Sequence, residues 1–426
     1  MKHRKISCSN GMGIVVGSPV KGDDFFNRER EIGDFTAAID RAAHLLVTAP
    51  RRTGKTSLLL EVAQRMSDRY YCLFIDVQAC TSEEDAVVKL ALEAREIRGL
   101  SEVVTDAFRS ALSTIIDRID EVGITEIKLK LHEAVTKDWR AKGDELLARL
   151  AKADKPVALF FDELPILVNR ILKGDDLRIT PERRQHAHVF LSWLREATIR
   201  HAGVLRFVAC GSIGLEPLLS QAAISETMTT FTPFYLPPWD RDTALAFLRD
   251  RAKRAGIEFR NDAEQRVLHL LGHYIPQHVQ MFMSFIREQA QSSGSHTCGP
   301  RDVERIYRRR MLSVHGHVDL ATYEDRLRRV VGPELVGAAL ELLTERAVVG
   351  RLTPKAAIHI VRSCVGAESD PVAELRFLLG LFTHDGYLKR VRNDYVFVSH
   401  LLRDWWKGRF SFGYMPVEKR MREQEN

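Results

Sequence analysis

The chain has 426 residues, of which 45% are hydrophobic and 28% are charged. This length predicts two or three domains of ordinary size, and this composition excludes both a single small module and a largely disordered chain. The formal net charge of +6 is a mild basic excess. It permits a nucleic acid or an acidic protein as partner, but it is also typical of an ordinary solvated surface.

The six cysteines are scattered without a Cys-x-x-Cys pair, which argues against a zinc knuckle or a disulfide framework and favours a reducing compartment. The apolar stretch at 11–17 is short and glycine-rich, and no later run approaches the roughly 18 apolar residues of a membrane span. We therefore expect a cytoplasmic protein without membrane contact.

The first part of the chain predicts alternating helices and strands. A helix at Phe35 to Ala43 precedes a short buried strand at His44 to Ala49. Apolar residues at helical spacing follow from Leu58 to Met66, and a second strand is predicted at Tyr70 to Val77. This strand–helix–strand unit implies parallel strands.

Three further strands are predicted at Val157 to Asp162, Leu205 to Gly211 and Thr232 to Leu236. Residues 81–154 predict a mainly helical insertion, interrupted at 123–131, where alternating apolar and polar residues predict an exposed strand. The expected fold class is α/β, with a doubly wound parallel sheet in a domain from 1 to 238.

The rest of the chain predicts mostly helices. Residues 239–300 predict a helical lid without strands, ending in a polar loop at 291–300. Residues 301–426 predict helices followed by two β-like runs around Asn393 and Asp394, the element order of a winged helix. We expect this winged-helix domain to be a module separate from the first domain.

A phosphate-binding loop is predicted where the first strand ends. The segment from Ala49 to Thr56 fits the pattern GxxxxGK[ST], except that alanine replaces the first glycine. Gly54 permits the tight turn, Lys55 is expected to reach the β- and γ-phosphates, and the Thr56 hydroxyl is expected to bind Mg²⁺. The residues predicted to bind nucleotide here are Ala49, Pro50, Arg51, Arg52, Thr53, Gly54, Lys55, Thr56 and Ser57.

A second part of the same site is predicted at the end of the strand Val157 to Asp162. Asp162 is expected to hold Mg²⁺ through water, and Glu163 to orient and deprotonate the attacking water. Ser212, just past another strand, is expected either to sense the γ-phosphate or simply to cap a helix. Together the motifs predict Mg²⁺-dependent ATP hydrolysis. The strand Tyr70 to Val77, between the two motifs in sequence, indicates an additional-strand ATPase.

Several segments resemble one known family. They are Asp24-Phe-Phe-Asn-Arg-Glu-Arg-Glu31, Ala49-Pro-Arg-Arg-Thr-Gly-Lys-Thr-Ser57, Phe160-Phe-Asp-Glu-Leu-Pro165, Cys210-Gly-Ser-Ile-Gly-Leu215, Gly272-His-Tyr-Ile-Pro276 and Tyr323-Glu-Asp-Arg-Leu327. They look like the archaeal-type ATPases of the STAND group, relatives of the origin-recognition initiator ATPases within the AAA+ assemblage. The resemblance implies that Phe26, Arg28 and Pro276 help to form the adenine and ribose pocket.

One departure from the ring-forming AAA+ motors bears on mechanism. Between Gly211 and Asp240 the chain has neither arginine nor lysine, so the usual trans-acting arginine is missing there. Arg195 and Arg200 on the preceding helix are alternative sources, although an ordinary solvated helix position explains each of them better. The resemblance therefore implies a slow ATP-dependent switch rather than constitutive turnover by a ring.

Two functional hypotheses remain open at this point. The first is an ATPase switch that regulates a partner protein, such as an effector nuclease in defence or mobile-element biology, or that self-associates. The second is an ATP-controlled, initiator-like protein that binds duplex DNA. The helix at 371–383 carries Arg376 as its single arginine and suits packing, whereas Lys389, Arg390 and Arg392 form the cluster predicted to contact phosphates.

Overall fold

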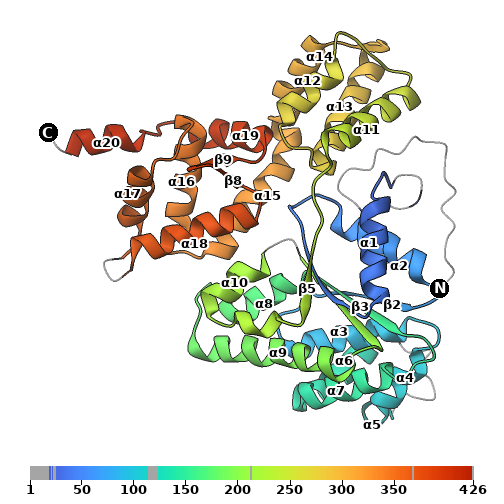
Figure 1. Ribbon diagram of the computed structural model, residues 1–426. Coiled ribbons are helices and arrows are strands. Elements are labelled where there is room, and N and C mark those ends of the chain that lie inside the picture. The colour runs from blue at the N-terminus through green and yellow to red at the C-terminus, as the bar shows by residue number, and fades with distance from the viewer. Residues whose placement is uncertain are drawn as a thin grey trace.

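The computed structural model describes residues 19–20, 22, 25–113, 123–211, 214–366 and 369–424. Their first part forms a parallel sheet between two layers of helices (Figure 1). The sheet has five strands in the order β2-β3-β4-β1-β5. Their bounds are β1 (His44–Thr48), β2 (Tyr71–Asp76), β3 (Val157–Asp162), β4 (Leu205–Cys210) and β5 (Phe231–Tyr235). The predicted doubly wound α/β fold class is confirmed.

The sheet is buried on both faces. On β3, Ala158 and Phe160 pack in one hydrophobic cluster with α1 (Glu29–Asp40) and α2 (Lys55–Met66). Leu159 and Phe161 belong to a cluster on the opposite face. A continuous apolar run such as Val-Ala-Leu-Phe-Phe suits a strand covered on both sides. Because the paired strands are parallel, their carboxyl ends lie at one edge of the sheet.

The helices of the insertion and of the opposite layer lie between β2 and β5 in the chain. They are α3 (Glu83–Arg95), α4 (Ser101–Ala107), α5 (Arg109–Leu112), α6 (Ile124–Lys137), α7 (Trp139–Leu150), α8 (Leu164–Lys173), α9 (Pro181–Arg200), α10 (Leu215–Ala222) and the 3-10 turn η3 (Ser225–Met228).

The exposed strand predicted at 123–131 is wrong, because this segment begins helix α6. Ile127, Leu131 and Val135 are buried at a spacing of four residues, which places them on one helical face. Leu129, which a strand would turn to the same side as Leu131, is 61% exposed. Over so few residues, the same apolar positions fit both an alternating pattern and a helical pattern.

The strand that lies between the two motif strands in the sheet is not the one that lies between them in the sequence. Strand β2 lies at the edge of the sheet, beside β3 alone. The strand that separates β1 from β3 in space is β4. The ends of β1, β4 and β3 are therefore neighbours, although β4 comes last of the three in the chain.

A helical lid follows the sheet, at the top of Figure 1. It contains α11 (Arg241–Arg254), α12 (Ala263–Leu271), α13 (Pro276–Ser293), α14 (Pro300–Ile306) and the π turn η4 (Tyr307–Met311). A short parallel pair, β6 (Glu258–Phe259) with β7 (Thr297–Cys298), corrects the expectation of a strand-free lid and loop. Because α14 packs against α12 and α13, the packing of the lid continues past residue 300.

The C-terminal segment extends from α15 onward. It contains α15 (Val314–Val331), α16 (Val336–Val349), α17 (Pro354–Cys364), α18 (Pro371–His384), β8 (Leu388–Val391), β9 (Asp394–Phe397), α19 (His400–Phe410) and α20 (Val417–Gln424). Strands β8 and β9 form an antiparallel hairpin. One hydrophobic cluster joins the lid to this segment, and it includes Trp405 and Trp406 as buried residues. Among the described residues, none of the helices is both long and apolar enough to span a membrane.

Candidate nucleotide-binding site

The loop between β1 and α2 forms a tight turn at the carboxyl edge of the sheet. Arg52 and Gly54 have positive φ angles of 67° and 90°. Glycine suits this left-handed conformation because it has no Cβ atom. The Thr53 hydroxyl donates a hydrogen bond of 2.7 Å to the carbonyl of Pro50 and closes the loop. The N-terminus of α2, with backbone N–H groups that the helix leaves unpaired, begins at Lys55 and is suited to an anion.

Lys55 is a buried cation. Its Nζ atom donates to the carbonyl of Ala49 at 3.4 Å. Burial lowers the pKa of Lys55, and the negative charge of Glu163 partly opposes this effect. An anion that enters beside Lys55 would restore the stability of the charged ammonium group, because an opposite charge favours the ionised form.

Two carboxylates stand at the end of β3. The Thr56 hydroxyl donates to Asp162 Oδ2 at 3.2 Å, which joins the start of α2 to the end of β3. Glu163 follows with a positive φ of 60°, and its backbone N–H donates to Asp162 Oδ1 at 3.0 Å. Beside them, burial raises the pKa of the Cys210 thiol, whose Sγ lies 3.2 Å from Asp162 Oδ1. The neutral thiol is thus a donor to the carboxylate.

The backbone of β4 ends directly against Glu163. A Cβ atom on Gly211 would lie 2.4 Å from Cδ of Pro165 and 3.4 Å from Glu163 Oε2. Only glycine fits there without displacing the proline. This close approach places the Glu163 carboxylate beside Gly211.

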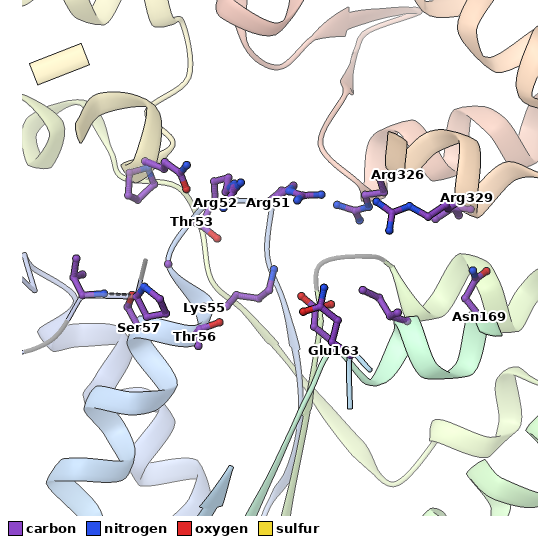
Figure 2. Close-up of a pocket in the computed structure, with 18 of the residues that line it drawn as sticks. Arg51, Arg52, Thr53, Lys55, Thr56, Ser57, Glu163, Asn169, Arg326 and Arg329 are labelled. Carbon is purple, nitrogen blue, oxygen red and sulfur yellow. Dashed lines mark hydrogen bonds between the residues drawn. The ribbon is translucent and has the colours of Figure 1, made fainter. Parts of the chain in front are cut away.

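A cavity of about 550 Å³ extends from these residues toward the lid. Its lining includes the loop residues 51–57 and Glu163 (Figure 2). It also includes Phe26, Arg28 and Pro276, which the family resemblance implied. The Phe26 ring packs edge-on against Trp239, with ring centroids 5.8 Å apart. One end of the cavity is therefore aromatic and apolar, and the other end is charged.

Arg28 connects the segment before α1 to the phosphate-binding loop. Its Nη1 donates to Glu31 at 2.6 Å and its Nη2 to the carbonyl of Thr53 at 3.5 Å. The neighbouring Asn27 donates to the Thr243 hydroxyl of the lid at 2.9 Å. Ser57 accepts a hydrogen bond of 3.1 Å from the backbone of Val20. The start of the described chain thus folds over the loop.

The remaining predicted residues have different positions. Ala49, Pro50 and Asp162 adjoin the lining residues through the contacts above, and Ser212 lies outside the described residues, so its role stays a prediction. Arg195 donates to Thr229, and Arg200 pairs with Asp144 at 3.0 Å; neither lines the cavity. The three basic residues of the hairpin, Lys389, Arg390 and Arg392, are exposed and also outside the lining.

Sequence reasoning missed the contribution of helix α15 to the site. Arg326 and Arg329 of this helix line the cavity. Two arginines of the phosphate-binding loop hold α15 in place: Arg51 donates to the carbonyl of Thr322 at 3.5 Å, and Arg52 pairs with Asp319 at 2.8 Å. The C-terminal segment therefore contacts the first domain through α15, and its division into a separate domain stays a prediction. Tyr323-Glu-Asp-Arg-Leu327 was the available signal, but nothing in its spacing assigned it a role.

Asp319 is the meeting point of the loop, the lid and α15. Besides Arg52, it accepts a hydrogen bond of 2.8 Å from the Gln277 side chain, and His278 Nε2 lies 3.2 Å away. Burial alone would raise the pKa of Asp319, but His278 and the two loop arginines outweigh it and lower the pKa. The carboxylate therefore stays ionised and binds all three parts together.

Comparisons with known proteins show the family of the chain. Residues 25–273 match a family described as an ATPase domain predominantly from Archaea. Two curated, uncharacterized ATP-binding proteins of Pyrococcus abyssi (strain GE5 / Orsay) are each 26% identical, over 237 and 239 residues. These matches cover 53% of this chain and 64% and 65% of the two relatives. The chain thus spans less than two thirds of the length of these relatives.

Solved structures share the fold over nearly the whole chain. A Walker-type ATPase of Pyrococcus abyssi has a TM-score of 0.58 at 15% identity, covering 92% of this chain and 99% of its own. The ORC2 protein of Aeropyrum pernix, in ADPNP–ADP complexes, has a TM-score of 0.52 at 12% identity, with 94% and 97% coverage. Since the family model matches more than half of the chain, this protein belongs to the family of ATPase domains found predominantly in Archaea.

Proposed function

We propose that the protein binds and hydrolyses Mg²⁺-ATP and acts as a slow, nucleotide-controlled switch on a partner. The observation that carries the ATPase part is the convergence of Lys55, Thr56 and Glu163 in one cavity at the edge of the sheet, where Thr56 also donates to Asp162. Membership of an ATPase family supports it. The nucleotide complexes of the ORC2 protein, which shares the fold, support it further.

The residues present fit Mg²⁺. Thr56 and Asp162 offer two neighbouring oxygen donors, and no group of three or more His, Cys, Asp or Glu among the described residues forms a metal site of its own. This suits an ion that is typically bound by one or two carboxylates together with phosphate and water oxygens. When bound, Mg²⁺ supplies positive charge that stabilises the transferring phosphoryl group.

The chain's own residues perform the remaining tasks. Lys55 and the N–H groups at the start of α2 hold the β- and γ-phosphates. Glu163 orients a water molecule and takes its proton while the water oxygen bonds to the γ-phosphorus and the bond to the bridging oxygen breaks, releasing ADP and phosphate. Phe26, Trp239 and Pro276 form the apolar end suited to the base and ribose.

The proposal of a slow switch rests on the stretch from Gly211 to Asp240. Ring-forming motors usually carry a trans-acting arginine there, whereas this chain has no arginine or lysine in it. A slow cycle favours control of a partner protein, and an effector nuclease in defence or mobile-element biology fits the family resemblance. The exposed Lys389, Arg390 and Arg392 favour the second candidate, an ATP-controlled protein that binds duplex DNA.

The substitution Glu163→Gln tests the proposed chemistry. The amide keeps the shape of the side chain but does not accept a proton, so ATP binding is retained while turnover falls by about a hundredfold or more. Asp162→Asn is the companion variant and is expected instead to weaken the Mg²⁺ dependence of binding. Phosphate release and ATP affinity are measured for both. Hydrolysis at the normal rate by Glu163→Gln would place the base elsewhere.

A further inference from the structure

Helix α15 brings its last turns to the nucleotide cavity. Arg326 and Arg329 form the wall opposite Lys55 and Glu163, and the Arg51 side chain extends toward Arg326 across the cavity (Figure 2). The ion pair of Asp319 with Arg52 fixes the preceding turns of the helix against the phosphate-binding loop. The contacts of α15 with the phosphate-binding loop therefore help to determine the position of Arg326.

The Arg326 guanidinium is buried and only partly satisfied. Its side chain is 5% exposed, and Nη2 lies 3.0 Å from Oδ2 of Asp385, which is itself 2% exposed. Among the residues that the structure describes, Nε and Nη1 of Arg326 have no hydrogen-bond partner, although both atoms are shielded from solvent. A buried donor without an acceptor is costly. Arg326, a lining residue of the cavity, therefore keeps two donor atoms that the described residues do not satisfy.

The charges around the cavity indicate what kind of acceptor suits these donors. Lys55, Arg51 and Arg326 lie close enough that the charge of Arg326, after burial, helps to lower the pKa of both other groups. Glu163 is the carboxylate that opposes this effect at Lys55. Such a concentration of cations fits a polyanion, and a guanidinium matches phosphate oxygens with two parallel hydrogen bonds.

We propose that Arg326 binds the terminal phosphate of ATP from within the same chain, so that the C-terminal segment is part of the nucleotide site. This inference rests on the proposed ATP binding and deepens it. The stretch between Gly211 and Asp240 contains no arginine or lysine. Under this inference the chain itself supplies a cation to the nucleotide, through Arg326. ADP lacks the phosphate that Arg326 would contact, so the C-terminal segment distinguishes ATP from ADP.

Asp385 carries the contact onward to the sheet. Its Oδ1 accepts a hydrogen bond of 3.1 Å from the backbone N–H of Gly214, between β4 and α10, while Oδ2 faces Arg326. The charge of Arg326 lowers the pKa of Asp385 against the opposing effect of burial. The terminal phosphate, the end of α18 and the start of α10 are thereby joined through two side chains.

The test compares ATP and ADP affinity in variants of the full chain. Arg326→Ala alone would leave Asp385 buried without its cation, so the main variant is Arg326→Gln/Asp385→Asn, which removes both charges and keeps an oxygen acceptor for Gly214. A non-hydrolysable ATP analogue and ADP are titrated, and thermal melts are recorded. The preference for the ATP analogue over ADP is expected to fall by about tenfold or more.

Two further variants provide the controls. Arg328→Gln changes an exposed arginine of the same helix, which pairs with Glu324 and does not line the cavity. It is expected to retain the wild-type ratio of affinities. Arg326→Lys keeps the charge and the pairing with Asp385 but offers no forked donors, so the ratio is expected to fall severalfold even if the double variant melts early.

The outcomes separate this inference from the proposed function. If wild type binds neither nucleotide, ATP binding itself is refuted. If wild type binds both nucleotides while the folded double variant and Arg326→Lys keep the wild-type ratio, only the role of Arg326 is refuted. Equal losses with Arg328→Gln would also overturn it, because they would show a general effect of charge.

Discussion

Lys55 is a buried cation whose charged form is not favoured by the folded protein alone. It is buried beside Glu163, and its hydrogen bond to the carbonyl of Ala49 is long, at 3.4 Å. Its lowered pKa means that the folded protein holds this proton less firmly than the unfolded chain does. The side chain thus contributes little to folding, and its favourable interaction awaits an anion.

For this reason Lys55→Ala is expected to weaken ATP binding strongly and to leave the fold intact. The affinity should fall by roughly a hundredfold, the upper range for a charge-assisted hydrogen bond, while the melting temperature stays equal or rises. Titration with a fluorescent ATP analogue, together with thermal melts, measures both. Lys152→Ala, on the exposed surface, is the matched control. An unchanged affinity would remove the whole site assignment.

At the scale of elements, α6 shows where sequence patterns are ambiguous. In an exposed strand, Leu129 and Leu131 would share one face, whereas in α6 they are separated: Leu131 is fully buried and Leu129 is 61% exposed. The segment is short, so both periods fit its apolar residues. The contacts with the rest of the insertion decide in favour of the helix.

The pair of leucines gives a direct test of this element. Leu131→Glu is expected to lower the free energy of unfolding by at least about 3 kcal/mol, because it removes buried apolar contacts and buries a charge. Leu129→Glu should change it by less than about 0.5 kcal/mol. Urea unfolding of the two variants provides the comparison. Similar losses in both would argue for a shared face and against the helix.

The parts of the candidate site whose place in the fold followed from the sequence are those with local causes. The turn before Lys55 needs glycine, and the carboxylates Asp162 and Glu163 end a strand that is apolar throughout. The position of β4 between β1 and β3 was missed because strand order in a sheet is not written in chain order. Arg326 was missed because its place depends on how α15 packs against distant residues.

For the whole molecule, the exposed hairpin tests the DNA hypothesis. Replacing Lys389, Arg390 and Arg392 by Ala should leave basal ATPase activity nearly unchanged, because none of the three lines the cavity. If duplex DNA is the partner, binding weakens across sequences alike and the salt slope flattens by roughly two to three units, about one for each lost phosphate contact. Binding is measured with and without ATP over a salt series.

The wild-type protein provides the decisive comparison for this prediction. If it shows no salt-dependent binding to any duplex, the hairpin does not contact DNA, and docking of a protein partner becomes the remaining hypothesis. The exposed hydrophobic residues Val372 and Val391, on α18 and β8, are then the first positions to substitute in a search for that partner.

The distance along the chain between the two ends of the cavity affects how the protein is made. Phe26 and Arg326 line one cavity although 300 positions separate them. At ordinary translation speeds the ribosome needs roughly 15 to 60 s to synthesise that interval. The sheet and its phosphate-binding loop emerge long before the helix that covers them. Under the proposed role of Arg326, full affinity for ATP therefore requires a polypeptide whose synthesis has passed α15, and partly made chains bind ATP more weakly.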